Sequence, residues 1–190
     1  MITSYVAVGD SFSAGIPRQT PWPDLVAAGL SEVSPSLRYR NFATAGVTSD
    51  EVAAEQLGPA LDRRPDLISL ICGANDVILS VRPDDLAFAR TLTAMFDRIA
   101  EEAPAARVVT ATYPPIVPAG CRPRTHERVR YGILRFNAII RRASHAHGAR
   151  CLDWQGHDEV GCPQNFARDG FHPSDRGHKL AAEDFLAEVA

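Results

Sequence analysis

Three residues near the two ends of this 190-residue chain have the types that make a serine hydroxyl a nucleophile. Ser11 follows an apolar run and Gly9-Asp10, and Asp169 stands three residues before His172. A serine attacks a carbonyl carbon only when a base accepts its proton, and a carboxylate can orient a histidine for that task. The pattern predicts Ser11 as nucleophile, His172 as base and Asp169 as its orienting partner. Each residue alone also fits an ordinary role: a helix cap or turn for Ser11, an Asx turn for Asp169, and a packed or surface position for His172.

Two other segments contain hydrogen-bond donors suited to the negative charge that such an attack creates. Gly46 ends the segment 41–46, which joins a predicted strand to a helix, and Asn75 follows an apolar run in Gly73-Ala74-Asn75-Asp76. Backbone N–H groups and Asn side chains that converge on an oxyanion stabilise a tetrahedral intermediate. We therefore predict the Gly46 N–H and the Asn75 amide as oxyanion donors, while a turn role explains either residue taken alone.

The rest of the chain alternates strand-like and helix-like segments. Short apolar runs predict strands at about 5–9, 67–72 and 108–112, and two further short segments, at about 38–43 and 149–152, are also predicted as strands. Helical spacing of apolar residues predicts helices at about 22–33, 48–61, 84–102, 126–147 and from 174 onward. Such alternation is typical of an α/β fold, and we predict a three-layer α/β/α sandwich with a central, mostly parallel, five-stranded sheet of flavodoxin-like type. One domain would span residues 1–190, with Ser11, Gly46 and Asn75 at the carboxyl edge of the sheet.

Four sequence blocks in this order resemble the SGNH hydrolases, also called the GDSL family of lipases and esterases. The blocks are Gly9-Asp10-Ser11-Phe12, Gly46 in its turn, Gly73-Ala74-Asn75-Asp76 and Asp169-Gly170-Phe171-His172-Pro173. The resemblance implies the SGNH hydrolase fold, with Ser11, His172 and Asp169 as the catalytic triad. It also implies an oxyanion hole made of the Ser11 N–H, the Gly46 N–H and the Asn75 side chain. Asp10 would hold the first block in shape.

A Pro-rich loop over residues 113–124 is the predicted source of a substrate pocket. Tyr113, Ile116 and Val117 from this loop would line it, together with Phe12 and Phe171 beside the catalytic positions. Ordinary loop and core packing explains these apolar residues equally well.

The predicted function is a serine esterase that acts on small to medium acyl esters through an acyl-enzyme, with no cofactor and no metal. Acyl transfer, thioester cleavage and lysophospholipid cleavage use the same machinery and stay open. In a different class, a non-catalytic protein could hold a ligand such as a phosphate at the sheet edge, but the first loop has neither a dinucleotide fingerprint nor a P-loop. The physiological ester, its acyl length and leaving group, and the oligomeric state are left open.

Composition narrows the class of partner and the compartment. The formal net charge of −3 and the absence of like-charge runs argue against nucleic acid. No apolar stretch is long enough for a membrane span. The first predicted strand begins within a few residues of Met1, which leaves no room for a signal peptide and predicts a cytoplasmic protein, unless a leader has been removed for secretion.

Cysteine and histidine positions complete the sequence-based expectations. The four cysteines form no close CxxC pair, so no zinc site is expected. Cys72 and Cys151 are expected in the core, and a disulfide between Cys121 and Cys162 is conceivable. The histidines other than His172, including His178 in the last helix, are expected at the surface.

Overall fold

A five-stranded parallel sheet forms the centre of the computed structural model, which describes residues 1–114, 116 and 118–189. The strand order is β2-β1-β3-β4-β5, and every neighbouring pair is parallel. The strands are β1 (Ser4–Gly9), β2 (Arg38–Asn41), β3 (Leu67–Ile71), β4 (Arg107–Ala111) and β5 (Arg150–Leu152). The predicted α/β sandwich with five strands is therefore confirmed, and the sheet is wholly parallel.

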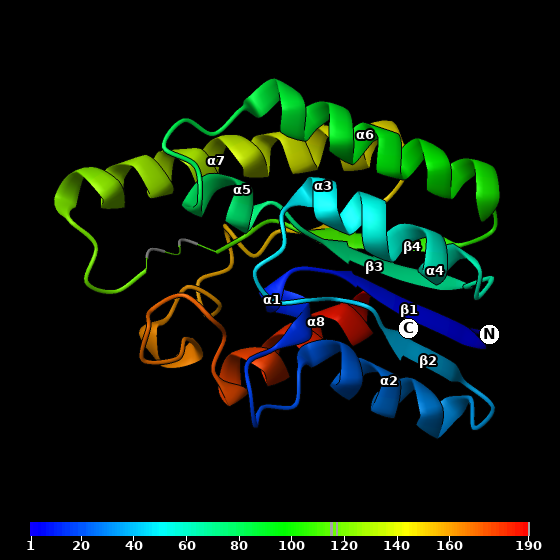
Figure 1. The fold of residues 1–190 in the computed structure, drawn as a ribbon. Coiled ribbons are helices and arrows are strands. Elements are labelled where there is room, and N and C mark those ends of the chain that lie inside the picture. Colours follow the sequence, from blue (N-terminus) through cyan, green and yellow to red (C-terminus); the bar gives the residue numbers. More distant parts are fainter. Residues whose placement is uncertain (115, 117, 190) are drawn as a thin grey trace.

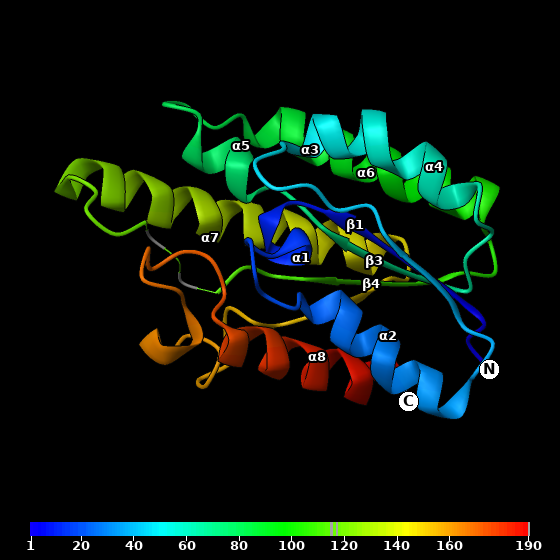
Figure 2. The ribbon, with the colours of Figure 1, turned by 60° about the horizontal axis from the view of Figure 1, so that its bottom comes forward.

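Helices cover both faces of this sheet, as Figures 1 and 2 show. On one face lie α3 (Ser49–Glu51), α4 (Leu57–Leu61), α5 (Ala74–Ile78), α6 (Asp85–Glu102) and α7 (Pro123–Ala146). On the other lie α2 (Trp22–Val33) and α8 (Asp175–Val189), which pack against each other. Three shorter pieces complete the structure: α1 (Ser11–Ala14), a π-helical segment (Val52–Gln56) between α3 and α4, and a 3₁₀ turn (Pro163–Asn165).

Burial of the strands follows their place in the sheet. Every residue of β1 and β3 is buried, because these strands have a neighbour on each side and helices above and below. Burial alternates along β2, which lies at one edge. Helix α6 buries one apolar stripe, made of Phe88, Leu92, Met95, Phe96 and Ile99, as its spacing predicts.

Local signals fix several helix starts. Thr48 and Glu51 form a capping box at the start of α3, where the Glu51 carboxylate accepts from the Thr48 N–H at 2.7 Å. Asp84 caps α6 by accepting from the Leu86 and Ala87 N–H groups. Helix α7 begins at Pro123, three residues before the predicted start, because proline without an N–H suits the first turn of a helix.

The expectations for cysteines and for His178 need correction. All four cysteines are free thiols, so Cys121 and Cys162 are not paired, and Cys151 is only partly buried. His178 is not at the surface: it is fully buried between α8 and the start of α2, where its Nδ1 accepts from the Trp22 N–H at 3.2 Å. Burial lowers the pKa of this imidazole to about 4. Among the described helices, none is both long and apolar enough to cross a membrane.

Candidate active site

The turn that presents Ser11 depends on a close approach between two strands. Strand β1 ends at Gly9, whose φ of 149° is unfavourable for a residue with a side chain. A Cβ at this position would lie 2.0 Å from the Ile71 carbonyl oxygen at the end of β3. Glycine therefore lets β1 turn directly into α1, and Ser11 becomes the first residue of that helix at the carboxyl edge of the sheet.

An unbroken chain of hydrogen bonds joins the three residues that the sequence predicts as a triad. The Ser11 Oγ lies 3.1 Å from His172 Nε2, and His172 Nδ1 lies 2.7 Å from Asp169 Oδ2. A carboxylate next to Nδ1 favours the tautomer with its proton on that nitrogen, which leaves Nε2 free to accept the Ser11 proton. The chain therefore has the direction that general-base catalysis requires.

Asp169 is held by more than the histidine. Its Oδ1 accepts from the backbone N–H groups of Phe171 and His172 at 2.9 and 3.0 Å. Partial burial raises the pKa of the Asp169 carboxyl, but the His172 side chain and the two N–H donors outweigh that effect and hold the pKa below its usual value. The carboxylate thus stays charged beside the imidazole.

The loop that carries Asp169 and His172 is closed at its base. Phe166 and Pro173 pair across it, and the Ala167 N–H donates to the His172 carbonyl at 2.8 Å. The Pro-rich loop also contacts it, because the Ala119 N–H donates to the Asp169 carbonyl at 2.6 Å. These contacts fix the loop between β5 and α8 in front of Ser11.

The two predicted oxyanion segments lie against each other. The Asn75 Nδ2 donates to the Val47 carbonyl at 2.8 Å, next to Gly46, and the Asp76 carboxylate accepts from the Ser49 N–H at 2.9 Å. Asn75 is buried, whereas Gly46 is exposed and has a φ of 87°. Apart from its two chain neighbours, none of the described residues has an atom within 4 Å of where a Gly46 Cβ would be, so there is open space beside this turn. The residues 73–76 therefore hold the turn at 46–49 in place.

A family model matches this arrangement along nearly the whole chain. The model of the GDSL-like lipase/acylhydrolase family matches residues 7–180. The chain belongs to this family. It is accordingly a hydrolase that acts on ester bonds, and the predicted resemblance is confirmed. No match was found among curated proteins.

Solved structures share the fold of this GDSL-family hydrolase. The lipase/acylhydrolase from Enterococcus faecalis has a TM-score of 0.80 at 23% identity, over 98% of this chain and 94% of that one. Axe2, an acetylxylan esterase from Geobacillus stearothermophilus, has a TM-score of 0.76 at 20% identity, over 99% and 94%. LAE5, an alpha/beta hydrolase enzyme from the metagenome of Lake Arreo in Spain, has a TM-score of 0.76 at 21% identity, over 97% and 94%.

Asp10, in the first block of the hydrolase, is buried, and its carboxylate is bonded to groups other than the histidine. Its Oδ1 accepts from the Phe12 N–H at 2.9 Å, and its Oδ2 accepts from the Tyr113 hydroxyl at 2.7 Å. Burial raises the pKa of Asp10 to about 6, although both hydrogen bonds oppose that rise. Asp10 thus connects the nucleophile turn with Tyr113, which lies two residues after the end of β4.

The predicted pocket residues mostly pack in the core. Phe12 stands edge-to-face against Tyr113 and Phe171, with ring centroids 5.0 and 5.4 Å apart, and all three rings are buried. Ile116 is also buried, and Val117 lies outside the described residues. Tyr113 and Ile116 line a cavity against α7, and Phe12 lines a different apolar pocket.

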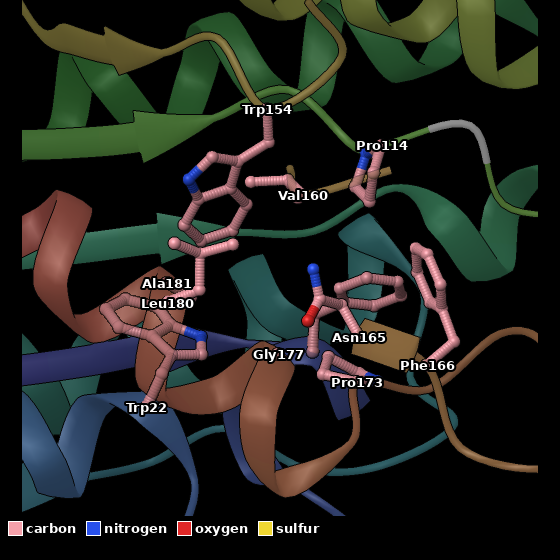
Figure 3. Close-up of a pocket in the computed structure, with 11 residues that line it drawn as sticks. Trp22, Pro114, Trp154, Val160, Asn165, Phe166, Pro173, Gly177, Leu180 and Ala181 are labelled. Carbon is pink, nitrogen blue, oxygen red and sulfur yellow. The ribbon is translucent and has the colours of Figure 1, made fainter. Parts of the chain in front are cut away.

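That second pocket lies between α8, Trp22 and the segment after β5 (Figure 3). Trp154, Phe166 and Leu180 supply much of its apolar wall, and Pro173, next to His172, closes one side. Two buried atoms of its lining residues, Trp22 Nε1 and Asn165 Oδ1, have no hydrogen-bond partner within the described part of the chain.

One supporting residue escaped the sequence analysis. Gln56, buried in the π-helical segment, accepts from the Gly9 N–H at 2.7 Å and donates to the Gly9 carbonyl at 3.0 Å. It satisfies both backbone groups of the residue that begins the nucleophile turn. Gln56 is four positions from both Val52 and Ala60, which are buried, and this helical spacing is a weak signal that Gln56 is buried too. No spacing in the sequence connects Gln56 with Gly9.

Metal ligands do not gather near these residues. Within residues 1–114, 116 and 118–189, no three His, Cys, Asp or Glu side chains form a group that could hold a metal ion.

Proposed function

We propose that this GDSL-family hydrolase cleaves small to medium carboxylic esters with Ser11, His172 and Asp169 as its catalytic triad. The observation that carries the proposal is the hydrogen-bond chain from the Ser11 Oγ through both nitrogens of His172 to the Asp169 carboxylate. Residues 1–190 would form one catalytic domain.

In the proposed reaction, the Ser11 Oγ forms a bond to the ester carbonyl carbon while His172 Nε2 accepts the hydroxyl proton. The carbonyl oxygen becomes an oxyanion, which the Ser11 N–H, the Gly46 N–H and the Asn75 amide would stabilise. When the intermediate collapses, the bond to the alcohol oxygen breaks and His172 gives its proton to that oxygen. Water then attacks the acyl-enzyme by the same route and releases the acid and Ser11. Asp169 stays charged throughout and stabilises the imidazolium.

The test is the replacement of Ser11 by alanine, with Ser13→Ala as the matched control in the same short helix. Loss of the nucleophile should lower kcat on a p-nitrophenyl acyl ester by roughly 10⁴-fold or more, as other triad deletions do. Ser13 is buried, and its Oγ has no partner in the described part of the chain, so Ser13→Ala should keep activity close to that of the unsubstituted protein.

A fluorophosphonate probe followed by intact-mass measurement checks the covalent step. One adduct is expected on the unsubstituted protein and on Ser13→Ala, and none on Ser11→Ala. An adduct mapped to any other serine would overturn the assignment. The activity of the unsubstituted protein on p-nitrophenyl esters of increasing acyl length would then define the acyl preference.

A further inference from the structure

A groove with a cationic lining runs beside the loop that carries Asp169 and His172. Its walls are the first half of α7 and the segment 161–170, which lie on the same side of the molecule in Figure 1. The charged or titratable lining residues are His126, Arg130 and Arg168, and Phe166 adds an aromatic surface. No acidic side chain is among the described residues that line it.

Helix α7, which forms one wall of this groove, is rich in positive charge. Helix α7 contains six arginines and one acidic residue, Glu127. Three of these arginines have fixed partners, because Arg128 donates to carbonyls at the end of α5, Arg135 pairs with Asp85, and Arg141 pairs with Asp153.

The two groove arginines differ from those three. Arg130 and Arg168 are exposed, and within the described part of the chain neither has a carboxylate at salt-bridge distance. The Arg130 guanidinium lies over the Tyr131 ring, 4.6 Å from its centroid. An unpaired guanidinium offers a fork of N–H donors that matches a carboxylate or a phosphate.

The groove lies next to the proposed triad, because its lining residues Arg168 and Gly170 stand on either side of Asp169 in the chain. Gly170, one of its lining residues, follows Asp169, and Asp169 is two hydrogen bonds away from the Ser11 Oγ. In the proposed reaction His172 protonates the leaving oxygen, so the alcohol part of the ester must lie on the histidine side. None of the described residues that line the groove comes from the segments of the proposed oxyanion donors Gly46 and Asn75, so the groove belongs to the histidine side, on which the alcohol would leave.

We propose that this groove binds an anionic group, a carboxylate or a phosphate, on the alcohol part of the ester substrate. The inference rests on the proposed function, because the position of the alcohol follows from the role of His172. Arg130 and Arg168 are the specificity-determining residues, and they act by attracting charge that a neutral ester lacks.

The experiment compares kcat/KM for aryl acetates that differ only in charge on the phenol. The probes are 4-acetoxybenzoate and 4-acetoxyphenyl phosphate as anionic substrates, and methyl 4-acetoxybenzoate as the neutral one. Ratios of anionic to neutral kcat/KM are compared between enzymes, so intrinsic differences in reactivity cancel. The double variant Arg130→Gln/Arg168→Gln should lower at least one ratio by roughly 10-fold, and added salt should lower that ratio in the unsubstituted protein. The probe whose ratio falls more in the double variant, the carboxylate or the phosphate, identifies the anionic group that the groove prefers.

Two controls distinguish binding of the anion in the groove from a general electrostatic effect of charge on the protein. Arg142→Gln removes an exposed charge from the far end of α7 and should leave both ratios unchanged. A carboxylate on the acyl side, in 4-nitrophenyl hemisuccinate compared with 4-nitrophenyl butanoate, should be insensitive to the double variant. Unchanged ratios in the double variant, an equal loss in Arg142→Gln, or an equal loss for the acyl-side carboxylate would each overturn the inference. Failure of the proposed function is a separate result, because Ser11→Ala would then still hydrolyse the neutral ester.

Discussion

The amide nitrogen of Asn75 has two N–H bonds, and the structure uses one of them on the Val47 carbonyl. The other remains for the oxyanion in the proposed reaction. If both roles hold, Asn75→Ala should lower kcat by roughly 10²–10³-fold, with a much smaller change in KM, because the oxyanion bond strengthens as charge develops. Asn75→Asp should be at least as harmful, since a carboxylate cannot donate. Turnover and melting temperature are measured on the same preparation, and a lower melting temperature with unchanged kcat would limit Asn75 to holding the turn.

The raised pKa of Asp10 predicts how the folding stability of the protein depends on pH. Its folded-state pKa of about 6 lies above the ordinary value of 3.8, so between these values the folded protein binds more protons than the unfolded chain. This carboxyl therefore makes stability fall as pH rises through that window. Asp10→Asn removes the titration, and an Asn side chain can still accept from Phe12 and pair with Tyr113.

Melting temperatures from about pH 4 to about pH 7 check this prediction. The difference between Asp10→Asn and the unsubstituted protein should move in favour of the variant as pH rises. Replacement of the exposed Ser36 by Ala, which changes no titratable group, should give a difference that does not change with pH. A flat curve for Asp10→Asn as well would contradict the raised pKa.

At the scale of elements, the sequence predicts the strands and the long helices, but it does not predict helices that are a single turn long. The sequence predicts all five strands to within about two residues of their ends. The apolar runs of β1 and β3 are buried on both faces of the parallel sheet, whereas β2 and β5 lie at its edges and have exposed residues. The pieces that hold the site, α1 and α5, are one turn long and have no apolar periodicity, so the pattern could not reveal them. His178 was misplaced for a related reason: its burial depends on α2 and Gln19, which no local pattern connects with α8.

The π-helical segment Val52–Gln56 supports the nucleophile turn through the bonds of Gln56 to Gly9. Gln56→Leu would leave the buried Gly9 N–H without its partner, while the Gly9 carbonyl would keep the Thr44 N–H at 3.1 Å, so the free energy of unfolding should fall by about 2 kcal/mol. Since Gly9 begins the nucleophile turn, kcat should also fall by roughly 10-fold. Urea denaturation and kinetics on Gln56→Leu and on the neighbouring exposed Glu55→Leu provide the comparison. Equal stability of the two variants would mean that the Gln56 contacts contribute little.

At the scale of the molecule, parallel topology explains why residues far apart in the sequence meet. The blocks at residues 9–12, 46 and 73–76 each follow a strand, so they share one edge of the sheet. The fourth block follows no strand directly, and its place in front of Ser11 depends on the contacts of the loop between β5 and α8. Sequence order could suggest that meeting only through the family resemblance. The substrate pocket was the least predictable part, because apolar loop residues serve a core and a pocket equally well.

The sheet has two edges, and β2 exposes one of them. Arg38 and Arg40 are exposed on β2, and charged side chains on an edge strand discourage pairing with another chain. Arg38→Thr/Arg40→Thr should therefore increase self-association, even though it makes the net charge more negative than −3. Light scattering during mild heating is the measurement. Arg142→Thr/Arg176→Thr, with the same change in charge on exposed helical positions, should not aggregate faster; equal aggregation would point to charge alone.

The chain has two tryptophans, Trp22 and Trp154, and the fold brings them together. Their rings stand edge-to-face with centroids 6.0 Å apart, both are buried, and both line the pocket that Pro173 closes next to His172. Tryptophan fluorescence from this protein therefore originates at one place, where α2 meets the segment leading to the loop that carries Asp169 and His172. A red shift in emission would report solvent entering there, so a spectrometer can follow loosening beside His172 without any added label.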